Sequence, residues 1–332
     1  MRRKIGEWQK SVYNTAFAWY TDTASERQRY GVCRAAARRK GFNVREFVIL
    51  TDSCCDLNWE TACADQIEAL PLSFRFGEEE YENHLDERDM SLHRFYERIR
   101  QGEMPSTAAV SVGAFEDAMR RHLRAGEDIL CLSFSSGLST TYQSAAIAAE
   151  HLKEEFPEGT IRVVDTLCAS GGEGLLVTLC ARQKAQGKSL QEISDYATAM
   201  IPHLCHWFTV DDLNHLKRGG RVSSTTAMLG TMLSIKPVLR MDDEGRLESI
   251  SKSRGRRQAL LALVERMEKS FDPSLSRTVF INHSDCLEDA EFVKQEILRR
   301  MDADISFHPI GPVIGSHTGT GTVALFFTGT NR

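Results

Sequence analysis

The fold is indicated first by residues 129–152, which read ILCLSFSSGLSTTYQSAAIAAEHL. A β-rich run at 129–134 leads into a turn of serines and a glycine at 135–139, and helix-forming residues follow at 142–152. A strand that passes through a polar turn into a helix is the repeating unit of a parallel α/β sheet. The stretch therefore predicts one such unit, and ligands of these sheets bind beyond the carboxyl ends of the strands.

The same pattern occurs on both sides of this unit. Residues 44–50 form a β-rich stretch that ends in Thr51-Asp52-Ser53, and residues 161–164 form another that ends in Asp165-Thr166 before a helix to about residue 186. Asp52 could cap the backbone that follows it, or serve as a metal ligand or catalytic carboxylate. Together the three units predict an N-terminal α/β domain with a parallel sheet.

The second half of the chain predicts a different architecture. Residues 236–240 and 247–251 are strand candidates on either side of a turn at 242–245, which is typical of a hairpin. Further strands are predicted at 207–210, 278–282 and 322–328, and helices at 224–234, 256–270 and 286–301. Mixed pairing follows, so we expect an α+β domain with an antiparallel portion. The predicted divisions are a 1–46 extension, a 47–200 domain and a 201–329 domain.

Composition is that of an ordinary globular protein. The 332 residues are 42% hydrophobic and 26% charged, which suggests about two domains. No apolar run approaches the roughly 18 residues of a membrane span, and the basic start is not followed by the apolar core of a signal peptide. The nine cysteines are odd in number and contain no C-x-x-C. They predict reduced thiols and a cytoplasmic location.

Charge is distributed unevenly along the chain. Residues 1–46 carry 11 Lys and Arg against 4 Asp and Glu, whereas the remainder has a net charge of −12. The main body is therefore expected to repel nucleic acid. The basic, aromatic extension could dock on a neighbouring domain, form an exposed helix, remain disordered, or contact a membrane surface or another anionic partner.

Hydroxyl groups gather on the turn that follows the central predicted strand. Ser135, Ser136 and Ser139, with two threonines after them, precede a helix whose free N–H groups and dipole favour anions. The turn is equally typical of a serine-rich helix cap. It lacks the second glycine of a G-x-S-x-G nucleophile elbow, and the sequence has no glycine-rich nucleotide motif.

Two further stretches, 217–223 and 315–321, combine glycines with Arg221 and His317. Glycines in a turn permit close backbone approach, and an arginine or histidine supplies a donor to a carboxylate or phosphoryl group. The basic run 252–257 is typical of a solvated surface. His203 and His206 could ligate a metal with a third residue, although such a pair is more often structural, so no metal is predicted.

These pieces, in this order, resemble the DegV family of bacterial fatty-acid-binding proteins. The resemblance extends from about residue 48 to 329 and rests on blocks that are specific only in combination. They are residues 51–53, 107–115, 135–145, 211–213, 216–221, 235–237 and 310–319.

The resemblance implies that two domains enclose one long-chain fatty acid, such as palmitate, stearate or oleate, in an apolar tunnel at their junction. No other cofactor is implied. The family's carboxylate-binding positions fall on Thr107, Ser139 and His317 here. We expect Ser135, Ser136 and Thr318 as additional head-group contacts.

The resemblance also implies a partner and a role. Family members are carriers rather than enzymes, and they present the bound acid to an ATP-using fatty acid kinase, whose acyl phosphate product feeds phospholipid synthesis. Arg221 and Arg254 correspond to the groups that face the phosphoryl group or the kinase.

The chain departs from the family pattern at two places. The family's T-S-Q-P-S stretch reads Thr107-Ala108-Ala109-Val110-Ser111, and the glycine after Ser139 is Thr140. These changes predict a different loop shape or chain-length preference, with a crowded turn at Thr140. A different function is also considered: a small-molecule hydrolase or transferase that uses Ser139 or Ser136 with His317 in the interdomain cleft.

Overall fold

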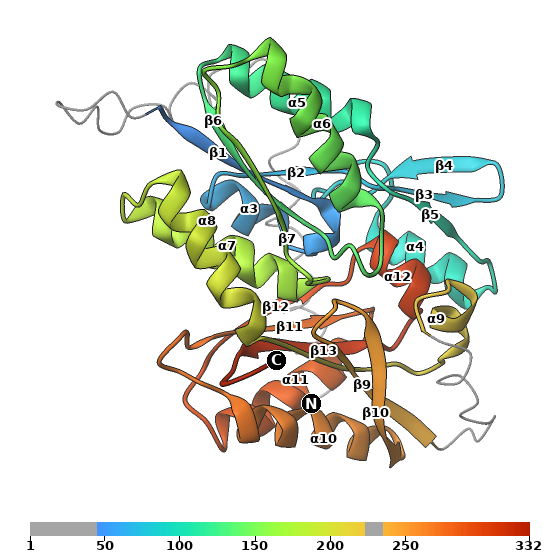
Figure 1. Cartoon of the computed structure of the whole chain (residues 1–332). Coiled ribbons are helices and arrows are strands. Elements are labelled where there is room, and N and C mark those ends of the chain that lie inside the picture. Colours follow the sequence, from blue (N-terminus) through green and yellow to red (C-terminus); the bar gives the residue numbers. More distant parts are fainter. Residues whose placement is uncertain (1–44, 223–234) are drawn as a thin grey trace, which may run out of the picture. The chain divides into compact units, whose positions relative to one another are not determined.

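The computed structural model describes residues 45–222 and 235–332. Residues 1–44, which make up nearly all of the predicted extension, and the helix predicted at 224–234 lie outside these ranges. Residues 45–332 group as one unit, and the described part of it is built on two larger sheets and one small sheet (Figure 1).

The first sheet has four strands in the order β2-β1-β6-β7, and every neighbouring pair is parallel. The predicted strands at 44–50, 129–134 and 161–164 are confirmed with shifted ends. Because the chain leaves β1 for β2 on one side and later fills β6 and β7 on the other, a topological switch point lies between β1 and β6. The strands are β1 (Phe47–Asp52), β2 (Ile67–Leu70), β6 (Asp128–Ser133) and β7 (Ile161–Asp165).

Helices cover both faces of this sheet, as expected for parallel strands. Helices α5 (Val112–Arg124) and α6 (Thr141–Glu155) pack together on one face, and α7 (Gly171–Ala185) and α8 (Leu190–Met200) lie on the opposite face (Figure 1). The helices predicted at 142–152 and to about residue 186 are therefore confirmed. The short α3 (Trp59–Ala64) precedes β2 and contacts it.

The second sheet has six strands in the order β10-β9-β8-β13-β11-β12. All neighbours are antiparallel except β11 and β12, so the predicted mixed sheet and the 242–245 hairpin are confirmed. Its outer face is covered by α10 (Arg256–Ser270) and α11 (Leu287–Leu298). The strands are β8 (Leu204–Thr209), β9 (Ile235–Met241), β10 (Leu247–Arg254), β11 (Thr278–His283), β12 (Asp304–Pro309) and β13 (Val323–Thr328).

Helix α7 lies between the two larger sheets. It contacts β1 and β6 of the first sheet and β8, β11 and β13 of the second, and its residues 171–181 are all buried. A helix that is buried on all sides needs small residues where its neighbours approach most closely. A Cβ on Gly171 would lie 2.1 Å from Asn282 Oδ1, and one on Gly172 would lie 2.0 Å from His206 Nε2. The two glycines thus allow α7 to approach the second sheet.

Several elements were not predicted from the sequence. A small antiparallel sheet has the order β4-β3-β5 and is backed by an aromatic cluster that includes Phe74, Phe76, Phe95 and Tyr96. The unpredicted elements include β3 (Ser73–Phe76), β4 (Glu79–Glu82), β5 (Ser106–Ala108), α4 (Leu92–Arg100), α9 (Asn214–Arg218), α12 (Pro312–Thr318) and the 3₁₀ turns η1 (Ser53–Cys55) and η2 (Ile201–His203). Among the described residues, no helix has the length and apolarity to cross a membrane. The domain boundary near residue 200 stays a prediction.

The close approach of α7 to the second sheet gives a test with a matched control. Gly172→Ala should destabilise the protein by about 1–3 kcal/mol, because the new methyl group overlaps the buried His206 ring. Gly113 holds the equivalent second position of α5, and its Cβ would meet only Ser111 Oγ at 4.0 Å. Gly113→Ala should therefore be neutral or stabilising. Urea denaturation midpoints check this, and equal effects of the two substitutions would contradict the packing.

Candidate ligand-binding site

A cavity of about 480 Å³ lies between the two halves of the described chain. This volume falls within the roughly 300–1,000 Å³ typical of small-molecule sites. One wall comes from the carboxyl edge of the first sheet, near its switch point, and the other comes from the inner face of the second sheet. Helix α12 and the small sheet complete the lining.

Most of the cavity wall is apolar. Leu72, Phe134 and Leu138 come from the first half, and Phe208, Met241 and further residues face them from the second sheet and its hairpin. A non-polar wall of this extent favours a hydrocarbon ligand over a polar one. The apolar lining residues are Leu72, Ala108, Ala109, Phe134, Leu138, Ala169, Phe208, Leu216, Met241, Leu247, Ile310, Val313, Ile314, Ala324 and Phe326.

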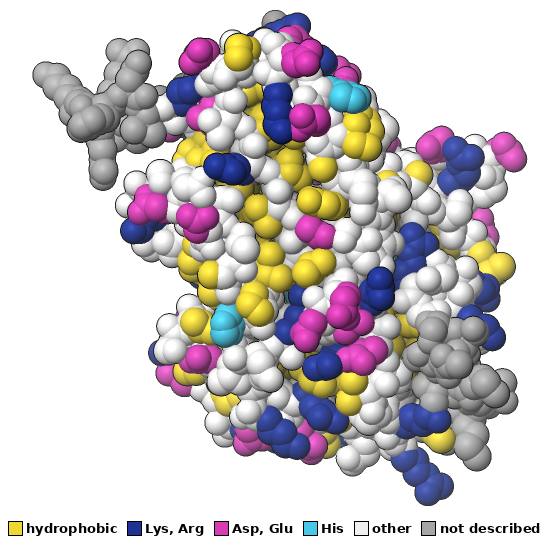
Figure 2. Space-filling model, viewed as in Figure 1, with side chains coloured by type: hydrophobic (Ala, Val, Ile, Leu, Met, Phe, Trp, Pro, Cys, Tyr) yellow, Lys and Arg dark blue, Asp and Glu magenta, His cyan; other side chains and the backbone are white. Residues whose placement is uncertain are grey.

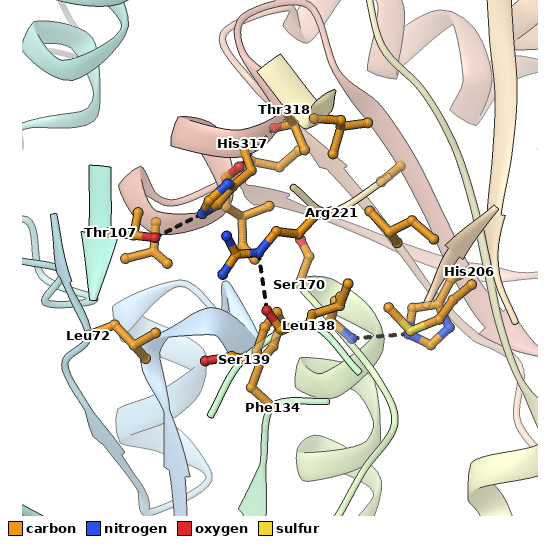
Figure 3. Close-up of a pocket in the computed structure, with 18 of the residues that line it drawn as sticks. Leu72, Thr107, Phe134, Leu138, Ser139, Ser170, His206, Arg221, His317 and Thr318 are labelled. Atoms are coloured by element: carbon orange, nitrogen blue, oxygen red, sulfur yellow. Dashed lines mark hydrogen bonds between the residues drawn. The ribbon is translucent and has the colours of Figure 1, made fainter. Parts of the chain in front are cut away.

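Polar side chains converge at one part of the cavity, where Thr107 of β5 meets His317 of α12 (Figure 3). Thr107 Oγ1 and His317 Nε2 are 2.8 Å apart and form a hydrogen bond. Arg221 extends toward the same place from the segment after α9, and Ser139 lies on the wall beside it. The structure thus brings together the three predicted carboxylate-binding residues and one predicted arginine.

The His317 imidazole is held neutral at this site. Burial, reinforced by the nearby Arg221 guanidinium, lowers the pKa of His317 to about 4. A Cβ on Gly219 would lie 2.2 Å from His317 Nδ1, so the glycine leaves room for the ring. A neutral imidazole has one N–H and one acceptor nitrogen, which allows it to donate to an anion without carrying charge.

Ser139 lies in the turn between β6 and α6. Its Oγ is 2.9 Å from Thr141 Oγ1 and accepts the Thr141 N–H at 3.2 Å, so the hydroxyl also helps to cap α6. Thr140 has φ −85° and ψ 7°, a conformation that needs no glycine. The expected crowding at Thr140 is therefore wrong, because its backbone does not require a glycine and its side chain is exposed.

Arg221 bridges the two halves of the molecule. Its Nε donates to the Leu138 carbonyl at 3.1 Å and its Nη1 donates to the Gly219 carbonyl at 2.5 Å. Burial lowers the pKa of Arg221, although a guanidinium still keeps its charge at any physiological pH. A half-buried positive charge at the polar part of an apolar cavity favours an anionic head group there.

The other predicted site residues divide into two groups. Ser136 and Thr318 line the cavity, although Thr318 Oγ1 already donates to the Ile314 carbonyl. Ser135 is fully buried outside the lining, and its hydroxyl donates to the Gly245 carbonyl of the β9–β10 hairpin at 2.8 Å. Arg254 is exposed at the end of β10 and does not line the cavity.

The glycine-rich stretch 315–321 is not the turn that the sequence suggested. Residues up to Thr318 belong to α12, and the glycines accommodate side chains of this protein. A Cβ on Gly315 would lie 2.7 Å from Tyr96 Oη, and one on Gly319 would lie 2.6 Å from His215 Cδ2. Gly315 and Gly319 therefore serve packing against α4 and α9, whereas His317 and Thr318 are the residues of this stretch that line the cavity.

Asp52 ties the two central strands together at the switch point. Its carboxylate accepts the Cys54 N–H at 3.1 Å and the Phe134 N–H at 2.9 Å. Burial raises its pKa to about 6. Of the roles considered for Asp52, the structure supports capping.

The two histidines considered as metal ligands have separate backbone partners. His203 Nδ1 contacts the Gly329 carbonyl, and His206 Nδ1 contacts the Leu204 carbonyl. Burial lowers the pKa of His206 well below its ordinary value. No group of three or more potential metal ligands occurs among the residues that the structure describes.

Comparison with known proteins agrees with this architecture. The model of the family described as "Uncharacterised protein, DegV family" matches residues 46–330. The chain belongs to the DegV family. The DegV domain-containing protein CPE0026 of Clostridium perfringens is 43% identical over 290 residues, which cover 87% of this chain and 99% of that protein.

Solved structures of the family share the fold. A DegV lipid-binding protein of Thermotoga maritima aligns with a TM-score of 0.76 and 25% identity, covering 86% of this chain and 99% of its own. A DegV family protein of Thermus thermophilus, described for its fatty acid binding, aligns with a TM-score of 0.75 and 27% identity over 85% and 99% of the two chains.

Sequence reasoning missed the apolar walls and part of the polar region. Met241 and Leu247 flank a hairpin turn, and nothing in their spacing shows that they face a cavity. The carboxylate-binding set itself could be found only through the family blocks, because Thr107 and His317 are 210 positions apart in the sequence.

The state of His317 gives a prediction. Its pKa of about 4 means that the folded protein should keep the ring neutral through the range where an ordinary imidazole, with a pKa of about 6.5, binds a proton. Since the unfolded chain takes up that proton first, the ring's contribution to stability should fall as the pH drops from about 6.5 to 4.

Imidazole ¹⁵N shifts measured by NMR against pH check the neutral state directly. Arg221→Gln should move the His317 titration midpoint upward, because a positive neighbour is removed. A wild-type midpoint near 6.5, or an unchanged midpoint in the variant, would contradict this description of the site.

Proposed function

We propose that this protein binds one long-chain fatty acid in the cavity and presents its carboxylate to an ATP-dependent fatty acid kinase. The observation that carries the proposal is the convergence of Thr107, Ser139, His317 and Arg221 at one part of a mostly apolar cavity. The fatty-acid-binding relative from Thermus thermophilus supports the choice of ligand.

The acyl tail supplies most of the binding energy in this proposal. A saturated tail of about 14 methylenes, at roughly 0.8 kcal/mol for each buried CH₂, contributes on the order of 11 kcal/mol before the costs of association. The apolar residues from both halves provide the surface against which such a tail is removed from water.

The carboxylate head group fixes the position of the ligand along the cavity. A carboxylate left unpaired in an apolar site costs several kcal/mol, so it must lie where donors converge. In the proposed complex the Thr107 and Ser139 hydroxyls donate to one oxygen and His317 donates to the other. Thr107 and His317 exchange their mutual hydrogen bond for bonds to the ligand, which keeps both groups satisfied.

The position of this polar region supports presentation to a kinase. Arg221 and the Thr107–His317 pair line both the cavity and a second recess beside it. A carboxylate held there can be reached by the γ-phosphorus of ATP. An oxygen of the acid would then form a bond to phosphorus, the bond between that phosphorus and ADP would break, and ADP would leave with the electron pair.

The hydrolase or transferase alternative needs a serine within hydrogen-bonding distance of its base. Among the described residues, neither Ser136 nor Ser139 forms such a bond to His317. Ser139 pairs with Thr141, and His317 pairs with Thr107. The structure therefore favours binding over serine-dependent catalysis.

Retention of the acid tests the binding proposal. Organic extraction and mass spectrometry of the protein as purified should find about one fatty acid per chain. Thr107→Val keeps the side-chain shape and removes a donor, so the affinity for palmitate should fall by about 1–3 kcal/mol. Thr160→Val, at an exposed threonine outside the cavity, should leave the affinity unchanged. No extractable fatty acid together with no measurable palmitate binding would refute the proposal.

The kinase part has a separate test. Lysate of the organism that makes the chain is mixed with ATP, hydroxylamine and palmitate-loaded protein, and acyl phosphate is trapped as the hydroxamate. Arg254→Ala should keep its bound lipid, because Arg254 does not line the cavity, yet yield less hydroxamate. If the Arg254→Ala variant yields as much hydroxamate as the wild type, Arg254 does not contribute to the contact with the kinase.

A further inference from the structure

Ser170 lines the cavity but has no part in the proposed fatty acid site. It lies at the end of the connection from β7 to α7, and Figure 3 draws it among the side chains of the cavity wall. Its backbone has φ 52° and ψ −141°, a region that residues other than glycine rarely occupy. Strain of this kind is typical of functional positions, because the surrounding structure must hold it in place.

The strained backbone of Ser170 does not serve to cap the helix. Ser91, Ser111 and Ser189 each precede a helix with φ between −74° and −68°, and each side chain accepts an N–H of the first turn. Ser170 forms no such bond at α7. Its hydroxyl instead donates to Asp56 Oδ2 at 2.6 Å. The turn therefore presents the hydroxyl to a carboxylate rather than to the helix.

Asp56 is held in place as a base for this hydroxyl. Its other carboxylate oxygen, Oδ1, accepts the Gly311 N–H at 2.9 Å, and the residue is only 3% exposed. Burial raises the pKa of Asp56 to about 7, against the lowering effect of the hydrogen bonds from Ser170 and Gly311. A carboxyl group whose pKa lies near neutral pH can accept a proton and return it, which a general base must do.

This arrangement has the features of a nucleophile elbow. In such an elbow a serine lies on a strained turn between a strand and a helix, usually in a G-x-S-x-G sequence. The stretch 168–172 reads Cys-Ala-Ser-Gly-Gly, which has the second glycine of that pattern and a cysteine in place of the first. The N–H after the nucleophile helps to bind the oxyanion in these elbows, and the Gly171 N–H has no hydrogen-bond partner within residues 45–222 and 235–332.

We propose that Ser170 and Asp56 form a nucleophile–base pair that hydrolyses a long-chain acyl ester or thioester, with the acyl tail in the same cavity. Ser170 Oγ forms a bond to the acyl carbon, and its proton passes to Asp56. The bond from that carbon to the leaving oxygen or sulfur breaks, and the leaving group departs with the electron pair and takes up the proton.

Water completes the reaction. Its oxygen forms a bond to the acyl carbon while Asp56 accepts its proton, and Ser170 Oγ leaves and recovers that proton. The product is a free fatty acid, which is the proposed ligand of the cavity. The inference rests on the proposed function only for the place of the acyl tail.

Hexadecylsulfonyl fluoride tests the pair, because an activated serine displaces the fluoride and keeps the sulfonyl group. Intact mass and peptide mapping should find the wild-type protein modified at Ser170. Asp56→Asn keeps the shape of the side chain and removes the base, so the rate of modification should fall about 100-fold or more. Hydrolysis of 4-nitrophenyl palmitate should fall in parallel.

Ser170→Gly removes the nucleophile and suits the backbone, because glycine adopts a positive φ without strain. This variant should fold and bind palmitate as the wild type does, yet show neither modification nor enzymatic hydrolysis. Ser189→Ala is the matched control, since Ser189 is a helix-capping serine outside the cavity lining. Its rates of modification and hydrolysis should equal those of the wild type.

Two results of the labelling would overturn the proposal. If hexadecylsulfonyl fluoride competes with palmitate but leaves Ser170 unmodified, the compound enters the cavity and the hydroxyl is inert. If the label is found on Ser136 or Ser139 instead, a different serine is the nucleophile.

Hydrolysis of 4-nitrophenyl acetate separates this inference from the proposed function, because the short ester needs no site for a tail. Equal hydrolysis by the wild type and Ser170→Gly, with palmitate still bound, would overturn the pair and leave the fatty acid site intact. Hydrolysis that depends on Ser170, in a wild type that binds no palmitate, would support the pair and contradict the proposed function alone.

Discussion

A single charge removed from water is the constraint on which the proposed site depends. An apolar cavity can hold a hydrocarbon chain of either orientation, but an ionised head group is tolerated only where hydrogen-bond donors and positive charge meet. The hydrogen bond between Thr107 and His317, 2.8 Å long, marks that place. It joins the edge of the small sheet to α12, while Ser139 arrives from the first sheet and Arg221 from the segment after α9.

Close contacts between the two halves hold the polar side chains of the site in their relative positions. Helix α7 is pressed between the two larger sheets because Gly171 and Gly172 carry no side chain. At the hairpin, a Cβ on Gly137 would lie 2.6 Å from the Gly245 carbonyl oxygen, and the neighbouring Ser135 hydroxyl bonds that same carbonyl. Two serines of this turn therefore have different roles. Ser135 forms a hydrogen bond between the two halves, and Ser139 lines the cavity.

The sequence predicted the elements whose signals are local. The strand at 129–134 is almost entirely apolar, the helix after it is rich in alanine, and the hairpin at 242–245 has an acidic turn that ends in glycine. The small sheet escaped prediction because its strands have three or four residues and β4 reads Glu-Glu-Tyr-Glu, mostly exposed. Helix α12 was not predicted because its glycines are typical of a turn. Gly315 and Gly319 instead leave room for Tyr96 and His215, and only the folded chain shows that these side chains lie there.

The candidate site was predictable only in part for the same reason. Thr107, Ser139, Arg221 and His317 were recognisable as parts of family blocks, whereas the apolar wall is assembled from side chains between residues 72 and 326. The final serine of the 107–111 stretch shows the limit of motif reading: Ser111 is retained, yet its hydroxyl caps α5 by accepting the Ala114 N–H. Of that stretch, the hydroxyl in the cavity belongs to Thr107 alone.

The central claim is that the acid group of a bound lipid stops at Thr107, Ser139 and His317, beside Arg221. A crystal structure of the protein loaded with palmitate tests it most directly. The account predicts carboxylate oxygens within hydrogen-bonding distance of Thr107 Oγ1 and His317 Nε2, with the tail among Phe208, Met241 and their apolar neighbours. A tail at the Thr107–His317 pair with the carboxylate elsewhere, or a cavity that excludes the acid, would contradict it.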